Sequence, residues 1–473
     1  MKRREALKAI GSTTIGAATS GSMASVGAAA DRSSKSAFKP GTLGDSHFLA
    51  ATNPIATADQ RDIETLAQEL LQTPLIRKAK TQASNRWKIL AGANVPAEAM
   101  VNFDAMMKEW TLHYLLLALN SDPDYPKIVN NNFGPPHEWF GLKVPGNRCP
   151  GNGEAVDNNY SFFPIDGHAR YELHGQRLSP TTGDCPIHVA TNLSMSINVA
   201  SLGLRDTKIN SDGSFIVTID SEPADGKRGR PNHLQTTIDS RYVYMRDART
   251  DWRQVPTAFR VRRLDPPAAP PLTVEQKTAM AARFIVDDVG ISFMYRQLVA
   301  FQDNNTVTAP EASTAFGGQA SQRVARCHLK LADDEAFVLT LTPGGADYVS
   351  VIANTYWLTS LNYWDHSSSL NTSQSIANAD GSFTYVISSR DPGIHNWIDT
   401  VGLHETLILL RWQLLPRNPD GSYGGSPWTR GQVVKLNDLD NILPSATMRV
   451  TPLERQQLLA TRRAEFNLRF VDH

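Results

Sequence analysis

The sequence predicts a mainly β protein with helical additions: two β-sandwich modules, an N-terminal helical cap, a helical connector and a C-terminal helix. Three observations support this fold class. A strand-loop-strand pattern occurs twice, once from Asp212 and again from Asp380. Short β-branched and aromatic runs, separated by turn residues, surround both copies. Apolar residues at helical spacing fill the segments before, between and after the two modules.

Residues 1–30 resemble a twin-arginine export signal. Arg3 and Arg4 precede a mildly apolar Gly/Ala/Ser-rich run, which ends in Ala28-Ala29-Ala30 before Asp31. We therefore expect cleavage after Ala30 and a periplasmic or secreted mature protein. The alternative is a disordered basic N-terminus in a cytoplasmic protein. No other segment reaches ~18 uninterrupted apolar residues, so we expect a soluble mature form that does not associate with a membrane.

Residues 31–130 are predicted to form the helical cap. Ile63, Leu66 and Leu70 recur at helical spacing, and Thr73-Pro74 is expected to end this helix. A second helix is expected after Pro96. One broad face of that helix carries Met and aromatic residues that we interpret as core, namely Met100, Phe103, Met106, Met107, Trp110, Tyr114 and Leu117.

Residues 131–264 are predicted to form the first β module. Within it, "GHARYELHGQ" alternates, so that Tyr171 and Leu173 face one side while His168, Glu172 and His174 face the other. The polar side fits a metal or acid–base site, and it also fits a solvated sheet face, which needs polar residues at alternate positions.

The remaining segments follow from composition and capping signals. Residues 265–335 combine the Pro-rich linker "DPPAAPPLT" with a helical connector that Thr273 and Gln276 are expected to start with a capping box. Residues 336–450 form the second β module. Residues 451–473 form the C-terminal helix, started by a second capping box at Thr451 and Glu454, with Leu458, Leu459 and Phe466 on one side.

The internal repeat extends over a whole unit. From Asp212 to Arg246 is 246 − 212 = 34 positions, and from Asp380 to Arg411 is 411 − 380 = 31. Each copy opens with Asp-Gly, which suits a tight turn because Gly accepts positive φ. We predict that Asp212 to Trp252 and Asp380 to Leu415 are equivalent strand-loop-strand units in two sandwiches that pack against each other.

Composition and motifs exclude several function classes. Lys plus Arg and Asp plus Glu both number 47, so no net charge attracts nucleic acid, and we expect no nucleic-acid partner. Three cysteines cannot all pair, and they do not have the spacing of a zinc site. There is no P-loop, no G-x-G-x-x-G before a helix and no G-x-S-x-G in a strand-turn-helix setting. Position 141 is Gly rather than the second His of a zinc-protease motif. We therefore expect no cofactor and assign no metal ligand.

Longer stretches carry a resemblance to a known family. They are "PPHEWFG", "DNNYSFFPIDGHARYELHG", "DGSFIVTIDSEPADGKRGRPNHLQT", "YVYMRDARTDW" and "DGSFTYVISSRDPGIHNWIDTVGLHETLILLRW". Together they resemble the DUF1214 family, a domain of unknown function in bacterial exported or membrane-associated proteins. The resemblance spans about residues 135–416 and implies a pair of jelly-roll-like β-sandwiches, but no settled reaction. Asn396-Trp397 corresponds to Asn232-His233 in the first half, where the pattern departs from the family.

Candidate catalytic residues concentrate in loops rich in aromatic, amide and ionisable groups. We predict that His137, Asp157 and Tyr160 form a reacting centre between the cap and the first module, because a His near a carboxylate can exchange protons near neutral pH. The alternative is that His137 caps a turn and that Asp157 makes an Asx-type turn.

The predicted substrate-binding residues are aromatic, amide, imidazole or guanidinium groups: Trp139, Asn158, Arg246, Trp252, His395, Trp397 and Arg411. Arg246 and Arg411 interrupt apolar strands, so each either pairs with a nearby carboxylate or grips an anionic or hydroxylated group. The expected partner is a small molecule or a glycan, and the sequence leaves a homo-oligomer open. Two functions remain: a hydrolase or lyase that uses His/carboxylate chemistry, and a non-catalytic ligand-binding or structural protein.

Overall fold

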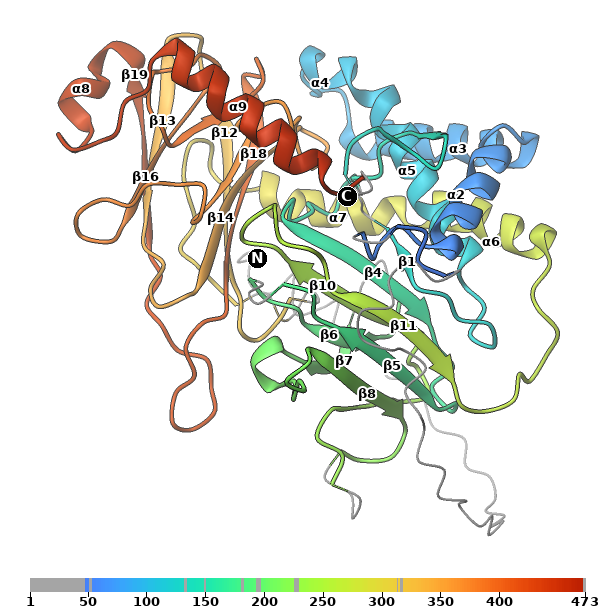
Figure 1. Ribbon diagram of the computed structural model, residues 1–473. Coiled ribbons are helices and arrows are strands. Elements are labelled where there is room, and N and C mark those ends of the chain that lie inside the picture. The colour runs from blue at the N-terminus through green and yellow to red at the C-terminus, as the bar shows by residue number, and fades with distance from the viewer. Residues whose placement is uncertain are drawn as a thin grey trace, which may run out of the picture. The chain divides into compact units, whose positions relative to one another are not determined.

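The computed structural model describes residues 47–50, 53–131, 134–148, 150–179, 183–192, 197–224, 229–312, 314 and 318–470 (Figure 1). The chain divides into two units, residues 1–37 and 38–473, and every described residue belongs to the second. The predicted export signal and its cleavage site therefore lie outside the described residues. The described part is mainly β with helical additions, arranged as two sandwiches, which confirms the predicted fold class.

The cap consists of α2 (Ala58–Leu71), α3 (Pro74–Ala91), α4 (Ala97–Val101) and α5 (Phe103–Leu119). Pro74 follows the end of α2 as predicted, but it also begins α3, where its missing N–H group costs nothing. Apolar residues occur all round α5, and most of its side chains are buried. Met100, which was expected on the same buried face, lies in α4 and is exposed.

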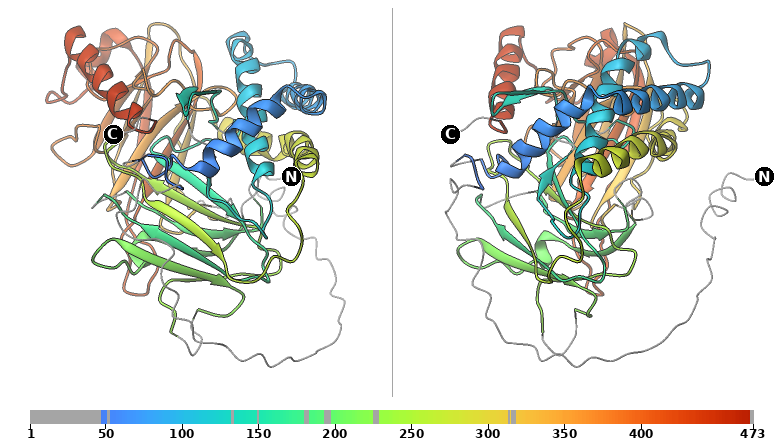
Figure 2. Two further views of the ribbon diagram at one scale, coloured as in Figure 1. Left: turned by 45° about the vertical axis from the view of Figure 1, so that its right-hand side comes forward. Right: turned by 90° about the vertical axis from the view of Figure 1, so that its right-hand side faces the viewer.

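The cap packs on α6 (Val274–Asp287) and α7 (Val289–Ala300), which form the helical connector. The indole of Trp110 donates a hydrogen bond of 2.8 Å to the carbonyl of Ile285 in α6. Trp357, from the second sandwich, donates one of 2.8 Å to the carbonyl of Ala99 in α4. Phe162 of the first sandwich belongs to the same apolar cluster, so the helices contact both sandwiches (Figure 2).

The first sandwich joins the sheets β1-β4-β10-β6-β7 and β11-β5-β8-β9. A short hairpin precedes β4, formed by β2 (His137–Trp139) and β3 (Leu142–Val144). Alternate residues of the two sheets meet in one apolar core. The sandwich strands are β1 (Val129–Asn130), β4 (Asn158–Pro164), β5 (Tyr171–Gln176), β6 (Ile187–Ala190), β7 (Asn198–Leu202), β8 (Ser214–Asp220), β9 (His233–Gln235), β10 (Tyr242–Ala248) and β11 (Ala258–Arg263).

The second sandwich joins the sheets β12-β18-β14-β15 and β17-β16-β13-β19 around a separate apolar core. Its strands are β12 (Arg323–Lys330), β13 (Glu335–Leu341), β14 (Tyr348–Asn354), β15 (Ser369–Asn371), β16 (Phe383–Ser388), β17 (Trp397–Asp399), β18 (Glu405–Gln413) and β19 (Thr429–Lys435). The short helix α8 (Leu439–Ile442) and the C-terminal helix α9 (Pro452–Asn467) follow β19.

The two sandwiches share one topology. With β1 set aside, the order β4-β10-β6-β7 matches β12-β18-β14-β15, and β11-β5-β8-β9 matches β19-β13-β16-β17. In both, the short strand after the loop pairs in parallel with the strand before it, β9 with β8 and β17 with β16. The repeat therefore extends over eight strands, and the predicted equivalence of the two strand-loop-strand units is confirmed.

Local chemistry repeats along with the topology. The turns before β8 and β16 contain Gly213 and Gly381, whose φ angles of 84° and 78° favour glycine. Asn232 accepts from the backbone N–H of Lys208 and donates to the carbonyl of the same residue, and Asn396 does the same with Ile376. The two Asn side chains therefore play equivalent roles, because each holds a neighbouring loop beside a pair of parallel strands.

The sandwiches pack against each other, as predicted. Asn371 of β15 donates a hydrogen bond of 3.0 Å to the carbonyl of Thr250, and Arg205 donates one of 3.1 Å to the carbonyl of Leu415. An apolar cluster at this junction includes Trp252 from the first sandwich and Ile352 from the second.

Both predicted capping boxes are present, at the starts of α6 and α9. The predicted apolar side of α9 is wrong at Leu458, which is 38% exposed, and is confirmed at Phe466, which is buried. The buried side of α9 carries Arg455, Arg462 and Phe466, and Arg469 just beyond the helix is also buried. Each of the three arginines donates to a backbone carbonyl of another segment.

Candidate functional site

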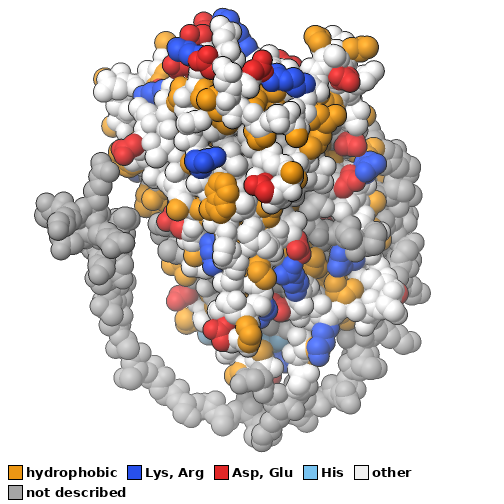
Figure 3. All heavy atoms as spheres, turned by 90° about the vertical axis from the view of Figure 1, so that its left-hand side faces the viewer, with side chains coloured by type: hydrophobic (Ala, Val, Ile, Leu, Met, Phe, Trp, Pro, Cys, Tyr) orange, Lys and Arg blue, Asp and Glu red, His pale blue; other side chains and the backbone are white. Residues whose placement is uncertain are grey.

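A groove opens on the outer face of the second sandwich, over the sheet β17-β16-β13-β19. Its cavity volume is about 360 Å³, which lies within the range of small-molecule sites. Figure 3 shows this side of the molecule, where hydrophobic, acidic and basic side chains are intermingled. The polar and aromatic lining residues include Thr340, Asn378, Thr384, Trp428, Arg430 and Gln432.

Strand alternation builds the floor of the groove. In β13, Phe337, Leu339 and Leu341 point into the sandwich core, so Val338 and Thr340 point outward. The ladder places Thr340 directly between Thr384 of β16 and Arg430 of β19. One cross-strand row of polar side chains therefore crosses the middle of the sheet.

Apolar residues cover the neighbouring part of the same sheet face. Leu439 and Leu443, in and after α8, pack on Ala336, Val338 and Val386. Ile442 and Pro444 then form one wall of the groove. One part of the outer face of this sheet is therefore buried, and the other part is an open groove. The boundary lies between the cross-strand row that contains Val338 and the row that contains Thr340.

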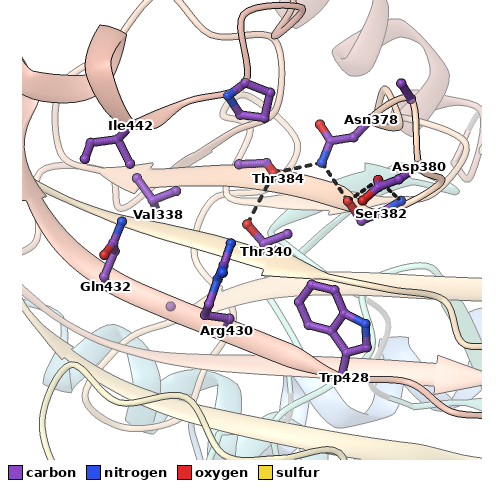
Figure 4. A pocket seen from close by; sticks show the side chains of 13 residues that line it. Val338, Thr340, Asn378, Asp380, Ser382, Thr384, Trp428, Arg430, Gln432 and Ile442 are labelled. Carbon is purple, nitrogen blue, oxygen red and sulfur yellow. Dashed lines mark hydrogen bonds between the residues drawn. The ribbon is translucent and has the colours of Figure 1, made fainter.

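The hydroxyl and amide groups on one side of the groove are held by each other. The Asn378 amide donates to the hydroxyls of Ser382 at 2.8 Å and Thr384 at 2.9 Å, and the Thr384 and Thr340 hydroxyls are 3.3 Å apart (Figure 4). Asp380 accepts from the backbone N–H of Ser382 at 2.9 Å and from its hydroxyl. These two bonds lower the pKa of Asp380, which is therefore a carboxylate at neutral pH.

Three side chains form the other side of the groove. Trp428, Arg430 and Gln432 occupy alternate positions along β19 and the residue before it, so they share one face of the strand (Figure 4). The Trp428 side chain is 43% exposed, which is unusual for a large aromatic residue. Within the described residues, the Arg430 guanidinium has no hydrogen-bond or ion-pair partner.

The arrangement is suited to hydrogen bonding and ring stacking. Hydroxyl, amide and guanidinium groups supply donors and acceptors, and the indole supplies an exposed apolar face. Among the described residues that line the groove, Asp380 has the only carboxyl group. The lining thus lacks the second carboxyl group that acid–base hydrolysis of a glycosidic bond ordinarily uses.

The predicted catalytic residue Asp157 lies at the junction of the sandwiches and is 1% exposed. Its Oδ1 accepts from the indole of Trp252 at 2.6 Å, and its Oδ2 accepts from the hydroxyl of Tyr348 at 2.5 Å. The predicted residues Tyr160 and Asn158 are also buried nearby in β4, and the Tyr160 hydroxyl accepts from the backbone of Ala155 at 2.9 Å. The structure therefore brings Asp157 and Trp252 together, and gives Asp157 two partners within the protein.

Arg246 and Arg411 occupy matching positions on the equivalent strands β10 and β18. Arg411 donates to the carbonyl of Gly153 at 2.6 Å, and burial lowers its pKa. The guanidinium of Arg246 lies 5.6 Å from the centre of the Tyr244 ring. Arg246 lies directly opposite Tyr160 in the ladder of β10 and β4, and both residues lie near enough to Arg411 to affect its pKa.

His137 and Trp139 lie on β2, against the cap and the C-terminal end of the described chain. The His137 ring stacks on Phe470 with centroids 4.2 Å apart, and its Nδ1 lies 2.9 Å from the carbonyl of Pro135. Burial lowers the pKa of His137 to about 4, so the ring is neutral at pH 7. The indole of Trp139 donates a hydrogen bond of 2.7 Å to the carboxyl group of Glu64 in α2.

His395 and Trp397 lie on the second sandwich beside α9. The Trp397 indole donates to the carbonyl of Ser388 at 3.2 Å, and the guanidinium of Arg455 lies 5.1 Å from its ring. The Nδ1 of His395 lies 3.2 Å from the side-chain oxygen of Asn396. The predicted residues are thus distributed over three places: the junction, β2 and the β17 edge.

The alternating polar residues of β5 do not form the solvated sheet face that was one of the two interpretations of this strand. Glu172 and His174 are buried rather than solvated, and His174 Nε2 lies 3.0 Å from Glu172 Oε2. Within the described residues, no group of three or more His, Cys, Asp or Glu side chains could hold a metal ion.

Sequence reasoning missed the groove residues Trp428, Arg430 and Gln432. The available signal was their alternation in "WTRGQV", which places an aromatic, a basic and an amide side chain on one strand face. Their exposure depends on where α8 ends, and the alternation carries no information about that.

Among the helices of the described segments, none combines the length and apolar character needed to cross a bilayer. No protein-family model matches the chain, and no curated protein matches it. A solved structure of an uncharacterized protein from Burkholderia cenocepacia is similar, with a TM-score of 0.63 and 22% identity over 79% of this chain and 100% of that one. A protein from Vibrio parahaemolyticus matches with a TM-score of 0.36 and 11% identity, over 60% and 90%. The likeness to the Burkholderia protein shows a shared fold, and the resemblance to DUF1214 stays a prediction.

Proposed function

We propose that this protein binds a glycan or another small polyhydroxylated molecule in the groove, without catalysing a reaction on it. One observation carries the proposal: the exposed indole of Trp428 stands beside a row of hydroxyl and amide groups on a rigid sheet (Figure 4). A sugar ring has an apolar C–H face and a rim of hydroxyls. The face can stack on the indole while the hydroxyls bond to the polar row.

The polar row is ordered before any ligand arrives. Asn378, Ser382, Thr384 and Thr340 are linked through their side chains, so little side-chain entropy remains to be lost on binding. The floor itself is a ladder of three strands, β16, β13 and β19. Such preorganisation supports a binding site more than a surface of mobile side chains would.

The same geometry favours binding over hydrolysis. Asp380 has the single carboxyl group among the lining residues that the structure describes, and its Oδ1 already accepts two hydrogen bonds from Ser382. The alternative, a hydrolase or lyase acting through His137, Asp157 and Tyr160, would require a substrate to reach Asp157, which is 1% exposed. That alternative stays a prediction.

The proposed place of action is the periplasm or the exterior of the cell. It is supported by the twin arginines Arg3-Arg4 and by Ala28-Ala29-Ala30 before Asp31. A glycan-binding role fits this location, because polysaccharides are abundant outside the cytoplasm.

The experiment is a glycan array followed by calorimetry on the best ligand, with wild type and Trp428→Ala. Loss of the stacking ring should weaken binding about 10-fold or more, which corresponds to about 1.4 kcal/mol. The matched control is Phe301→Ala, which removes a ring that is 72% exposed at the end of α7, outside the groove. Retained affinity in Trp428→Ala, or no glycan bound by the wild type, would contradict the proposal.

A further inference from the structure

Arg430 differs from the other basic residues of the second sandwich. Arg326 pairs with Glu311, Arg449 with Asp440, and Arg455 with Asp391 at 2.9 Å. Arg323 and Arg411 have no ion pair, but each donates to a backbone carbonyl. In the described part of the chain, the Arg430 guanidinium has neither kind of partner, although it lines a groove with a polar floor. A cation in that position is available to an anionic group of a ligand.

The equivalent arginine of the first sandwich is covered by another part of the chain. In the strand register, Arg260 lies opposite His174 of β5, and Arg430 lies opposite Thr340 of β13. The two arginines therefore occupy the same position of the repeated fold. The guanidinium of Arg260 lies 5.0 Å from the centre of the Phe48 ring, and Phe48 is fully buried against Ala258. The same register aligns Ala258 with Trp428. At this position the protein itself covers the face of the first sandwich, whereas the face of the second sandwich is open.

A ligand that pairs with Arg430 is placed to contact Trp428 as well. The two residues lie two positions apart on one strand face, so their side chains are neighbours above the sheet (Figure 4). A ring stacked on the indole would therefore carry its substituents within reach of the guanidinium. The planar fork of Arg fits a carboxylate with two parallel hydrogen bonds.

We propose that the groove selects glycans that contain uronic acid residues, with the sugar ring stacked on Trp428 and its carboxylate paired with Arg430. This inference rests on the proposed function and specifies its ligand class. Asp380 lines the same groove but belongs to the turn before β16, across the groove from Arg430 (Figure 4). It is placed to accept from ring hydroxyls, while Arg430 receives the carboxylate.

The test compares uronic acid oligosaccharides with their carboxyl-reduced counterparts, which have the same linkages but a neutral hydroxymethyl group. Wild type should bind the acidic form about 10-fold more tightly, and added salt should narrow the difference. Arg430→Gln should remove this preference while keeping the affinity for the reduced form. Trp428→Ala should weaken binding of both forms.

The matched control is Arg449→Gln, an exposed arginine of the same sandwich that does not line the groove. Its affinities should equal those of the wild type. Equal affinity of the wild type for acidic and reduced forms, or an unchanged preference in Arg430→Gln, would overturn this inference and leave the proposed function standing. No binding of either form by the wild type would overturn this inference, and only the absence of any bound glycan on the array would overturn the proposed function as well.

Discussion

Replacing Asp157 with Asn should destabilise the protein, because this carboxylate is a buried connection between the two sandwiches. Trp252 donates to one of its oxygens from the first sandwich, and Tyr348 donates to the other from the second. An amide keeps only one acceptor oxygen and adds an NH₂ donor. Either the indole N–H or the phenol O–H would then face a donor.

The magnitude has two parts. Loss of one hydrogen bond to a charged group costs about 1.5–3 kcal/mol. The lost charge adds to this cost, because burial lowers the pKa of Arg249 to about 9 and of Arg462 to about 10, and Asp157 acts against both shifts. Since the donor left without its acceptor is buried and costs about a further 1–3 kcal/mol, we expect a total loss of about 3–5 kcal/mol.

The assay is thermal unfolding followed by tryptophan fluorescence. At about 2.1 cal/mol/K per residue, a unit of 473 − 37 = 436 residues would lose roughly 3–5 °C in Tm. Asp380→Asn is the matched control, because it changes the same group in an exposed turn and keeps the acceptor for Ser382. A Tm of Asp157→Asn within 1 °C of wild type would refute a structural role and return Asp157 to the catalytic candidates.

Three further outcomes are expected. Burial raises the pKa of Glu154 to about 8, so the folded state holds a proton that the unfolded chain releases from about pH 4.5 upward. Stability should therefore fall between pH 4.5 and 8, and Glu154→Gln should flatten this fall in urea unfolding; parallel profiles of variant and wild type would contradict the reasoning. Gly431→Ala would place a Cβ atom 2.1 Å from the Phe337 ring and should cost about 1–3 kcal/mol, whereas Gly290→Ala, with open space around it, should not destabilise; equal stability of the two variants would speak against this account. Replacing both arginines of the export signal with lysine should retain the protein in the cytoplasm, and a mature form that still begins at Met1 on N-terminal sequencing would end the export prediction.

The sequence predicted the features that local chemistry specifies. The two Asp-Gly turns need positive φ at Gly213 and Gly381, and that requirement is visible in the dipeptide itself. Both capping boxes depend on residues three positions apart, so Thr273 and Thr451 predicted the starts of their helices from the sequence. The repeat also predicted that the two strand-loop-strand units are equivalent, and the shared strand order confirms it.

Features that depend on which face is covered could not be predicted. Alternation in β5 identified two faces correctly, but not that the polar face, with His174, is buried. Alternation near β19 likewise could not show that the segment around α8 covers the sheet only up to the row that contains Thr340 and Arg430. The polar and aromatic residues around Asp157 suggested a cleft, yet the same composition serves a buried junction, where hydrogen bonds connect two sandwiches.

The arginines of the C-terminal helix have a consequence for how this protein can vary. Arg455, Arg462 and Arg469 recur every seven residues and donate to the carbonyls of Ile394, Tyr363 and Val156. A carbonyl is present whatever the side chain, so substitutions at those three partner positions can leave the contacts intact. A deletion of one residue within the helix would instead rotate every later anchor by about 100° and shift it by about 1.5 Å. The arginine contacts themselves should therefore survive exchanges at the partner positions better than a change of length within the helix, although the three partner side chains are buried and their exchange is limited by packing.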